Sequence, residues 1–554
     1  MHLLARFTNA CQTDQMVQIV LWLLRATVLV VRIALSVTRC ILTIVHTLYR
    51  WHGFNPGGAL GSARFASGWE LLWSGVRRGS GPIVGRKGRS FLRFNKDGMI
   101  AVFAPMGAGK GVGIVIPNLL DYRGSIVCTD IKGENSAITR RQRATLGKVR
   151  TLDTTDPYHS DHFNPLDMIR AGTFHERDDA EALARLMIIP DEKTSHWDAK
   201  TEGLLACIIL YVMQLGVEQR NLAQVRTLST LPPESFKELL RTICTSGARA
   251  AAEIAASFMA MDGSEEFRSI LSNTEKATRV WAAGGPAGEI SRYSNFDLGN
   301  LVRDVKTLYL VVDEEKLDIY AGFLRVMVGS VLNALTRSKN LPRPKRKVLL
   351  LLDEAAALGS LEPLERGVGY LRAYCTPLLV FQDLSQLRTI YRRAGSFLAN
   401  AACKVFFNVS DLDAAKFVSE IVGQTTSLSR NEGTSHSNVD PIRQHHSLGQ
   451  SETGRWLLDP SEVMRLPGKR AIVMYRSDIL RYPVLASKVN YRSWRNLRWR
   501  GKFDAWPAIP ASRGVPVRRQ ECAPAQQTDW PTRSDGPTDA RGCQAKRGKG
   551  GQAH

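Results

Sequence analysis

An apolar run and a helical pattern enclose the turn Phe103-Ala104-Pro105-Met106-Gly107-Ala108-Gly109-Lys110-Gly111. The run Ile100–Ala104 predicts a buried strand, and the pattern over Val112–Leu120 predicts a helix. A glycine-rich turn between a strand and a helix is the context of a phosphate-binding loop, whose backbone N–H groups surround the phosphate. The helix adds the positive end of its dipole. We therefore expect residues 104–111 to bind a nucleotide, with Lys110 reaching the β- and γ-phosphates.

The turn departs from the pattern G-x-x-x-x-G-K-[ST] at two positions. Ala104 stands where the first glycine is usual, and Gly111 stands where Ser or Thr offers a hydroxyl to Mg²⁺. Alanine fits if its φ is negative, and water must replace the missing hydroxyl. The alternative interpretation is a glycine-rich turn that binds no nucleotide.

A second apolar run, Val348–Leu352, is followed by the acidic pair Asp353-Glu354. A buried parallel strand is apolar on both faces, and the sites of α/β proteins lie at the carboxyl ends of such strands. Asp353 is the candidate for holding Mg²⁺ through its water shell, and Glu354 is the candidate general base. With the phosphate loop, this pair predicts an ATP hydrolase that uses ATP and Mg²⁺. A solvated acidic turn is the alternative.

Further polar residues complete the candidate catalytic set of Lys110, Asp353, Glu354, Arg372 and Gln382. Gln382 follows the next apolar run and is a candidate sensor of the γ-phosphate, or else a capping residue. Arg372 is a candidate finger that acts on the transition-state charge across a subunit boundary, or else an ordinary surface residue. A third stretch, Asp130-Ile131-Lys132-Gly133-Glu134-Asn135, either lines the site or forms a plain turn.

The order of elements predicts the fold class. Runs with β-branched character predict buried strands at Ile100–Ala104, Ser125–Asp130, Lys148–Asp153, Thr307–Val312, Lys347–Glu354, Pro377–Asp383, Lys404–Val409 and Arg470–Tyr475. Helical patterns separate most of them, which indicates an α/β protein with a mostly parallel sheet. Helical patterns at Asp178–Met187, Glu202–Leu215 and Pro233–Cys244 have no convincing strand among them. We expect an all-α domain inserted into the α/β domain.

We divide the chain into five segments on this basis. They are a membrane-associated segment (1–54), the first part of the nucleotide-binding domain (55–175), the all-α domain (176–298), the second part of the nucleotide-binding domain (299–504) and a basic disordered tail (505–554). Residues 425–454 are rich in Ser, Thr, Asn and Gln and predict a long mobile loop.

The charge and the cysteine content indicate which partners the protein binds and whether its thiols are reduced. The 554 residues contain 74 Lys and Arg against 52 Asp and Glu, a net charge of +22, which suggests nucleic acid, anionic lipid or an acidic protein as partner. The charge is concentrated at the ends: residues 1–100 carry 13 basic and 3 acidic residues (+10), and residues 491–554 carry 13 and 5 (+8). The 9 Cys include no Cys-x-x-Cys pair, which argues against a zinc ribbon and for reduced thiols.

The most apolar stretch, residues 16–48, contains Arg25, Arg32 and Arg39 at intervals of seven. Its 13 Leu, Ile and Val between residues 21 and 44 favour insertion by about 4 to 8 kcal/mol. Arg32 opposes insertion by about 3 kcal/mol, and the outer two arginines can extend toward the headgroups. The balance favours a membrane helix over a surface-lying or a soluble helix. Basic residues from Arg50 to Arg93 then place the main body in the cytoplasm.

An ordered series of motifs resembles the TraG/VirD-type coupling proteins of type IV secretion and conjugation. The matching stretches cover roughly residues 55–480 and are Gly61-Ser62-Ala63-Arg64, Ala104–Gly113, Ile116–Leu120, Asp130–Asn135, Phe163–Asp167, Leu352-Asp353-Glu354, Gln382 with Ser385-Gln386-Leu387, Arg455–Leu458 and Asp459–Val463. Each motif is weak alone, but their order is specific.

The resemblance implies a RecA-like P-loop ATPase domain with an inserted all-α domain, in a homohexamer at the bacterial inner membrane. It implies that the protein recruits a relaxase–DNA complex or protein effectors and delivers its cargo to the channel components of type IV secretion. The basic charge at the two ends adds the expectation that the chain contacts single- or double-stranded DNA without sequence specificity. Lys110, Asp353 and Glu354 then take the phosphate, metal and water roles. In such proteins Gly often follows the loop lysine, as Gly111 does here. Typical members have two membrane helices with a small periplasmic segment, whereas this chain has one arginine-bearing stretch.

Two rival functions remain at this point. One is another hexameric DNA translocase, and the other is a docking platform that binds substrates without hydrolysing nucleotide. Retention of Lys110, Asp353 and Glu354 argues against the second.

Overall fold

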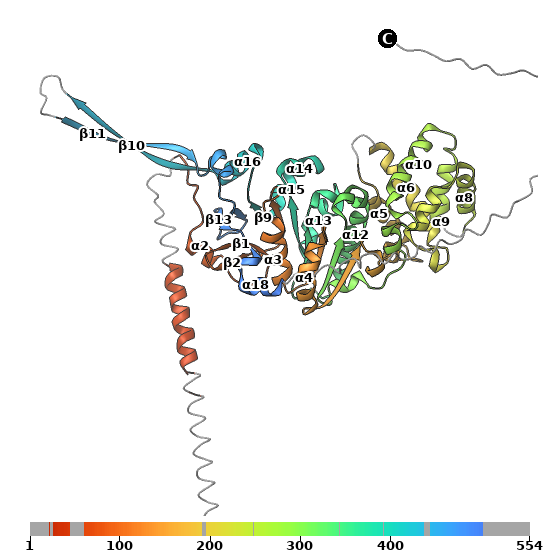
Figure 1. Ribbon diagram of the computed structural model, residues 1–554, viewed down its shortest axis with the longest axis horizontal. Helices are drawn as coiled ribbons and strands as arrows, with labels where there is room; N and C mark the ends of the chain where they lie inside the picture. Colours follow the sequence, from red (N-terminus) through yellow and green to blue (C-terminus); the bar gives the residue numbers. More distant parts are fainter. Residues whose placement is uncertain are drawn as a thin grey trace, which may run out of the picture. The chain divides into compact units, whose positions relative to one another are not determined.

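The computed structural model describes residues 22, 26–44, 60–190, 195–246, 249–342, 344–391, 393–436 and 444–501 (Figure 1). The predicted tail at 505–554 lies outside these ranges, as does Arg25 with the two ends of the apolar stretch.

The centre of the protein is an 11-stranded sheet with the order β2-β1-β13-β12-β9-β3-β8-β7-β4-β6-β5. Seven neighbouring strands from β9 to β5 run parallel, and β12, β13, β1 and β2 continue the sheet in antiparallel fashion. The strand bounds are β1 Ile83–Lys87, β2 Ser90–Arg93, β3 Met99–Phe103, β4 Ile126–Asp130, β5 Lys148–Asp153, β6 Lys306–Val311, β7 Val348–Leu352, β8 Cys375–Phe381, β9 Ala401–Phe406, β12 Arg470–Tyr475 and β13 Val484–Ser487.

Burial on both faces explains why the parallel strands were predictable. Every residue of β3, β4, β7 and β8 is buried, as expected for strands covered by helices on each side. Phe103, at the end of β3, stacks on Phe381 and Phe406 of the two neighbouring strands at centroid distances of 5.9 and 5.0 Å. The predicted α/β class is confirmed, and each predicted strand is present within a few residues of its expected bounds.

The antiparallel strands β1, β2 and β13 were not predicted. They are four or five residues long, carry Arg86, Lys87 and Arg93, and lack a long apolar run. One of these basic side chains is held by a neighbouring strand: Lys87 Nζ donates to the carbonyl of Leu485 in β13 at 2.9 Å. Such strands are recognised from their pairing rather than from local composition.

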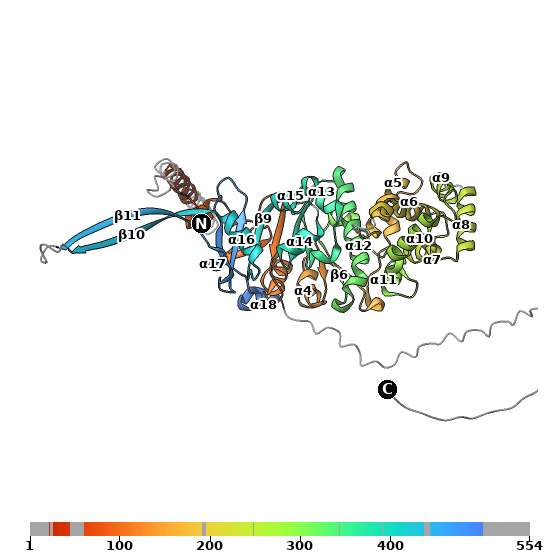
Figure 2. The same cartoon turned by 90° about the horizontal axis from the view of Figure 1, so that it is seen from above.

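Helices cover the sheet and fill the region that the sequence assigned to an all-α domain (Figures 1 and 2). The helices of the sheet region are α2 Gly68–Trp73, α3 Ile116–Asp121, α4 Glu134–Ala144, α12 Leu317–Arg337, α13 Glu362–Leu371, α14 Leu384–Ile390, α15 Ala394–Asn400, α16 Leu412–Val422, α17 Pro460–Met464 and α18 Arg495–Arg500. Those of the helical region are α5 Glu176–Met187, α6 Ser195–Val212, α7 Leu222–Ser229, α8 Pro233–Thr245, α9 Arg249–Met259, α10 Glu265–Thr278 and α11 Pro286–Ile290.

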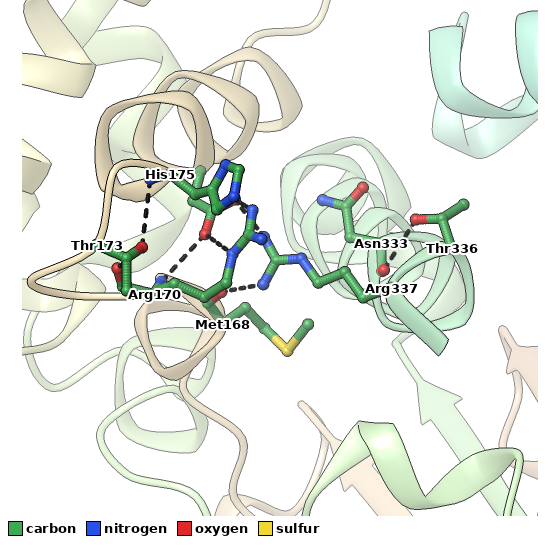
Figure 3. Close-up of polar contacts among 8 residues, drawn as sticks. Met168, Arg170, Thr173, His175, Asn333, Thr336 and Arg337 are labelled. Carbon is green, nitrogen blue, oxygen red and sulfur yellow. Dashed lines mark hydrogen bonds and ion pairs between the residues drawn. The ribbon is translucent and has the colours of Figure 1, made fainter. Parts of the chain in front are cut away.

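Helix α12 joins the two regions, because it packs against α5 as well as against the segment after β7. Asp179 on α5 is buried and accepts two hydrogen bonds of 2.8 Å from the guanidinium of Arg170, and one of 2.5 Å from Arg337 at the end of α12. Figure 3 shows Arg170 and Arg337 pointing toward one another, and Arg337 also donates to the Met168 carbonyl. This cluster fixes the first turn of α5 to the sheet region.

A two-stranded ribbon replaces the mobile loop that we expected at residues 425–454. Strand β10, Gln424–His436, pairs antiparallel with β11, Gln444–Trp456, in continuous register from Gln424 opposite Trp456 to His436 opposite Gln444 (Figure 2). For residues 425–436 and 444–454 the prediction of a loop was wrong, because backbone pairing does not require apolar side chains and a polar composition conceals it; residues 437–443 lie outside the described ranges.

Within the described ranges, two helices are long and apolar enough to cross a membrane. One, Glu314–Arg337, contains α12 and is 78% buried in the protein core. The other, Ala26–Ile44, has 19 residues, a mean hydropathy of 1.9 over an 18-residue window, and no buried residue in that window. The helix predicted within residues 16–48 is therefore present over its described part.

Candidate nucleotide site

The phosphate loop lies at the carboxyl end of β3 and leads into a π-helical turn, Gly111–Val115, and then α3. Gly107 and Gly109 have φ values of +72° and +76°, which residues with a Cβ adopt only with strain. Ala104 donates its N–H to the carbonyl of Phe381 at 2.9 Å and does not have a positive φ. The substitution of Ala for the usual first glycine is therefore accommodated.

Glu354 contacts two other predicted site residues, Lys110 and Gln382, and also Gln386. It adopts a left-handed conformation after β7 (φ +59°), is buried, and forms an ion pair with Lys110. Gln382 Nε2 donates to Glu354 Oε1 at 2.9 Å, and Gln386 Nε2 donates to the same oxygen at 3.0 Å. The structure thus brings the loop lysine, the acidic strand end and the polar end of β8 together at one edge of the sheet.

Asp353 lies beside this group, in a buried position. Its Oδ1 atom is buried without a hydrogen-bond partner, and Oδ2 accepts from Asn135 Nδ2 at 3.4 Å. Burial raises the pKa of Asp353, and the nearby charge of Lys110 partly opposes the rise. An unpartnered carboxylate oxygen beside a phosphate loop fits a residue that holds Mg²⁺ through bound water. The described residues contain no cluster of three or more His, Cys, Asp or Glu side chains suited to a metal ion.

Asp130 caps a helix, while Lys132 lies at the surface. The Asp130 carboxylate accepts the N–H groups of Asn135 at 3.3 Å and Ser136 at 2.7 Å, at the start of α4. Burial raises its pKa to about 7, against the opposing effect of these two bonds. Lys132 forms an exposed ion pair of 3.0 Å with Glu314. Glu134 is the first residue of α4, so this stretch combines a capped turn with Asn135, which contacts Asp353.

Within this chain, Arg372 lies away from the other predicted catalytic residues. It follows α13, just before the amino end of β8, and is exposed. It lines a cavity of about 950 Å³, whose other lining residues include Asn95, Asp97, Glu365, Arg476 and Arg481. The parallel strands begin at this edge of the sheet, whereas the phosphate loop lies where they end.

Four residues near the site were not assigned a role from the sequence. Asn135 belongs to the motif Asp130–Asn135, and Gln386 to the motif Ser385-Gln386-Leu387. Their short distance in sequence from Asp130 and Gln382 could have indicated that they lie near the site. Lys488 donates from Nζ to the Ala108 carbonyl at 2.7 Å, and to Oδ1 of Asn408 at 3.4 Å. Lys488 follows β13 and Asn408 lies two residues beyond β9, so strand pairing alone reveals their proximity to the loop.

The sequence pattern of the family described as "Type IV secretory system Conjugative DNA transfer" matches residues 74–496. The chain belongs to this family. It is 30% identical over 464 residues to the protein VirD4 of Agrobacterium fabrum (strain C58 / ATCC 33970), covering 79% of this chain and 66% of that protein. It is 29% identical over 404 residues to the conjugal transfer protein TraG of Escherichia coli, covering 69% and 64%. The chain thus spans about two thirds of the length of these relatives.

Solved structures of the plasmid coupling protein TrwB have the same fold as this chain. The complex of TrwB with the ATP analogue ADPNP superposes with a TM-score of 0.59 at 17% identity, covering 79% of this chain and 96% of TrwB. The complex with ADP and Mg²⁺ gives 0.58 at 17% identity, covering 77% and 93%. The predicted resemblance to coupling proteins is confirmed, and so is the combination of a large sheet with a helical insertion.

Proposed function

We propose that the chain is an ATP-hydrolysing coupling protein that delivers DNA, with its relaxase, or protein effectors to a type IV secretion channel. The observation that supports this most is the contact of Lys110 with Glu354 and of Glu354 with Gln382, at the end of the phosphate-loop strand. The relative TraG is named for conjugal transfer, and TrwB has been solved with ADPNP and with ADP and Mg²⁺.

The residues of the site divide the work as follows in this proposal. Lys110 exchanges its contact with Glu354 for the nucleotide's phosphates, which frees the carboxylate. Gln382 and Gln386 then hold Glu354 in place, so that it accepts a proton from the attacking water. Asp353, whose Oδ2 accepts from Asn135, would hold Mg²⁺ through bound water, and the ion would neutralise phosphate charge. The loop itself, Ala104 to Gly111, surrounds the phosphates with N–H donors.

The assembly and its location are part of the same proposal. We infer a homohexamer at the inner membrane, anchored by the helix Ala26–Ile44, with the body in the cytoplasm. We also propose that the chain is divided into a nucleotide-binding domain (55–175 and 299–504), an all-α domain (176–298) and two end segments (1–54 and 505–554). Since Arg372 is exposed and remote from Lys110, it reaches a nucleotide only across a subunit boundary. Arg372→Ala subunits mixed with Glu354→Gln subunits should then regain activity, and no recovery in mixed rings would refute a role in trans.

The decisive experiment measures ATP hydrolysis by the full chain in detergent, with and without single- or double-stranded DNA. We expect hydrolysis that DNA stimulates, and none in the Lys110→Ala variant. No hydrolysis and no ATP binding in the folded wild type would favour the docking platform. Hydrolysis that drives DNA movement without any secretion partner would favour a general hexameric translocase.

A further inference from the structure

Lys488 holds the phosphate loop from the side opposite to Glu354. Its aliphatic stem crosses Gly113, where a Cβ would lie 3.7 Å from the lysine Cδ. The ammonium then reaches the Ala108 carbonyl at 2.7 Å and Asn408 Oδ1 at 3.4 Å, and lies 5.1 Å from the centre of the Phe407 ring. A single side chain therefore ties the loop, the following turn and the end of β9 together.

The bond to Ala108 determines where the next amide points. A trans peptide places its C=O and N–H on opposite sides, so holding the carbonyl of Ala108 directs the N–H of Gly109 away from Lys488. Within the described chain, the N–H of Gly109 donates to no other atom, whereas Ala108 donates its N–H to Pro105. Gly109 is thus prepared as a phosphate donor by a contact on its other face.

Asn408 shows that this arrangement is built at a conformational cost. Asn408 and Glu354 are the two non-glycine residues with positive φ in the described part of the chain, at +53° and +59°. Each follows a strand near β3, and each contacts a lysine of the site. Residues other than glycine keep a left-handed backbone only where the surrounding structure holds them in it. Such residues are common at functional sites.

We propose that Lys488, supported by Asn408, is a positioning residue for nucleotide binding, one that orients the Ala108–Gly109 peptide of the phosphate loop. The proposal rests on the proposed function, because it concerns the same nucleotide site. Burial lowers the pKa of Lys488, in agreement with an ammonium packed behind the loop.

The test compares Lys488→Met with Lys87→Met in the full chain in detergent. Lys87 is a matched control, because it is half-buried in the same antiparallel part of the sheet and also donates to a backbone carbonyl, that of Leu485. We expect Lys488→Met to raise the dissociation constant for ADP and the KM for ATP about tenfold, the size of a lost charge-assisted hydrogen bond, with kcat changed less than about threefold. Lys488→Arg should restore most of the affinity, and Lys87→Met should leave it unchanged.

A second variant keeps the proposal testable if Lys488→Met does not fold. Asn408→Gly retains the left-handed backbone but removes Oδ1, and we expect about threefold weaker ADP binding. Wild-type affinity in Lys488→Met or, failing that protein, in Asn408→Gly would overturn the role of Lys488. A folded wild type that binds no nucleotide would instead overturn the proposed function along with it.

Discussion

Glu354 combines a left-handed backbone with a buried carboxylate that contacts three polar side chains. A non-glycine residue in this conformation costs about 1 to 3 kcal/mol, which the protein spends to aim one side chain. The contacts with Gln382 and Gln386 are both made by amide N–H donors to Oε1. A glutamine at position 354 could still accept these two hydrogen bonds through its Oε1. It could not accept a proton from water, because an amide is not a base at neutral pH.

Glu354→Gln should therefore retain ATP binding and lose turnover by about 10²- to 10⁴-fold, the usual contribution of a general base. The measurement is steady-state ATP hydrolysis together with ADP affinity. Glu314→Gln is the control, because Glu314 follows β6 at the same edge of the sheet but is exposed. A rate in Glu354→Gln equal to that of the control would remove Glu354 from the water-activating role.

The proximity of Lys110, Glu354 and Gln382 was predictable, because each follows an apolar run and the carboxyl ends of parallel strands meet at one edge. The location of Lys488 was not. Its strand, β13, has four residues, and it reaches the same edge only because two antiparallel reversals, β9 to β12 to β13, restore the direction of β9. Non-local pairing of short strands leaves no local signal.

Among the elements, α5 is fixed to α12 by charge rather than by apolar contact alone. Burial by itself would raise the pKa of Asp179, but hydrogen bonds from Arg170 and the charge of Arg337 outweigh it and lower the pKa. The ion pairs leave only 6% of the Asp179 side chain exposed. Removing the carboxylate leaves two arginines facing each other without a counter-charge.

Asp179→Ala should lower the free energy of unfolding by about 3 kcal/mol, near the lower value for a broken buried pair because both arginines are partly exposed. Denaturation with urea measures it, with Asp178→Ala as the exposed neighbouring control. Because the folded pKa lies below the unfolded value of about 3.9, this stabilisation is present above that pH and is lost as the pH falls through the folded pKa. Equal stability of the two variants would contradict the structural role.

A second tie between elements involves Arg325 on α12. Its guanidinium is buried and donates to the carbonyls of Leu186 at the end of α5, at 3.3 Å, and of Leu358 and Ser360 after β7, at 2.9 and 2.6 Å. Burial lowers its pKa to about 10. The segment that begins at Glu354 is therefore joined to the helical region by one side chain. The sequence indicates an apolar helix here, but composition does not reveal which backbone carbonyls accept hydrogen bonds from Arg325.

At the scale of the whole molecule, the helix Ala26–Ile44 is apolar and has no buried residue in its 18-residue apolar window. Thr38 and Thr43 donate their hydroxyls to the carbonyls four residues earlier, at 2.7 Å each, so these groups need no water. Satisfied hydroxyls suit a lipid environment. Arg32 and Arg39 are the polar groups that oppose insertion.

Arg32→Leu should make the full-length protein harder to extract from membranes with carbonate, because it removes a cost of about 3 kcal/mol at mid-span. Arg78→Leu removes the same charge from the body and should leave extraction unchanged. The measurement is the fraction of protein retained in the membrane pellet. Complete release of the wild type by carbonate would refute insertion and leave a surface-lying helix.

The position of β3 in the sheet has a consequence for the order in which a nascent chain folds. Its partners β8 and β9 are encoded far downstream: Phe103 pairs with Phe406, and 406 − 103 is 303 residues. At ~5–20 residues per second, about 15 to 60 s separate their synthesis. The helices α5 to α11 emerge in that interval and can form from local contacts. Meanwhile the strand that carries the phosphate loop has both edges unpaired, so the ribosome-bound chain is open to misassociation until Ala401–Phe406 leaves the exit tunnel.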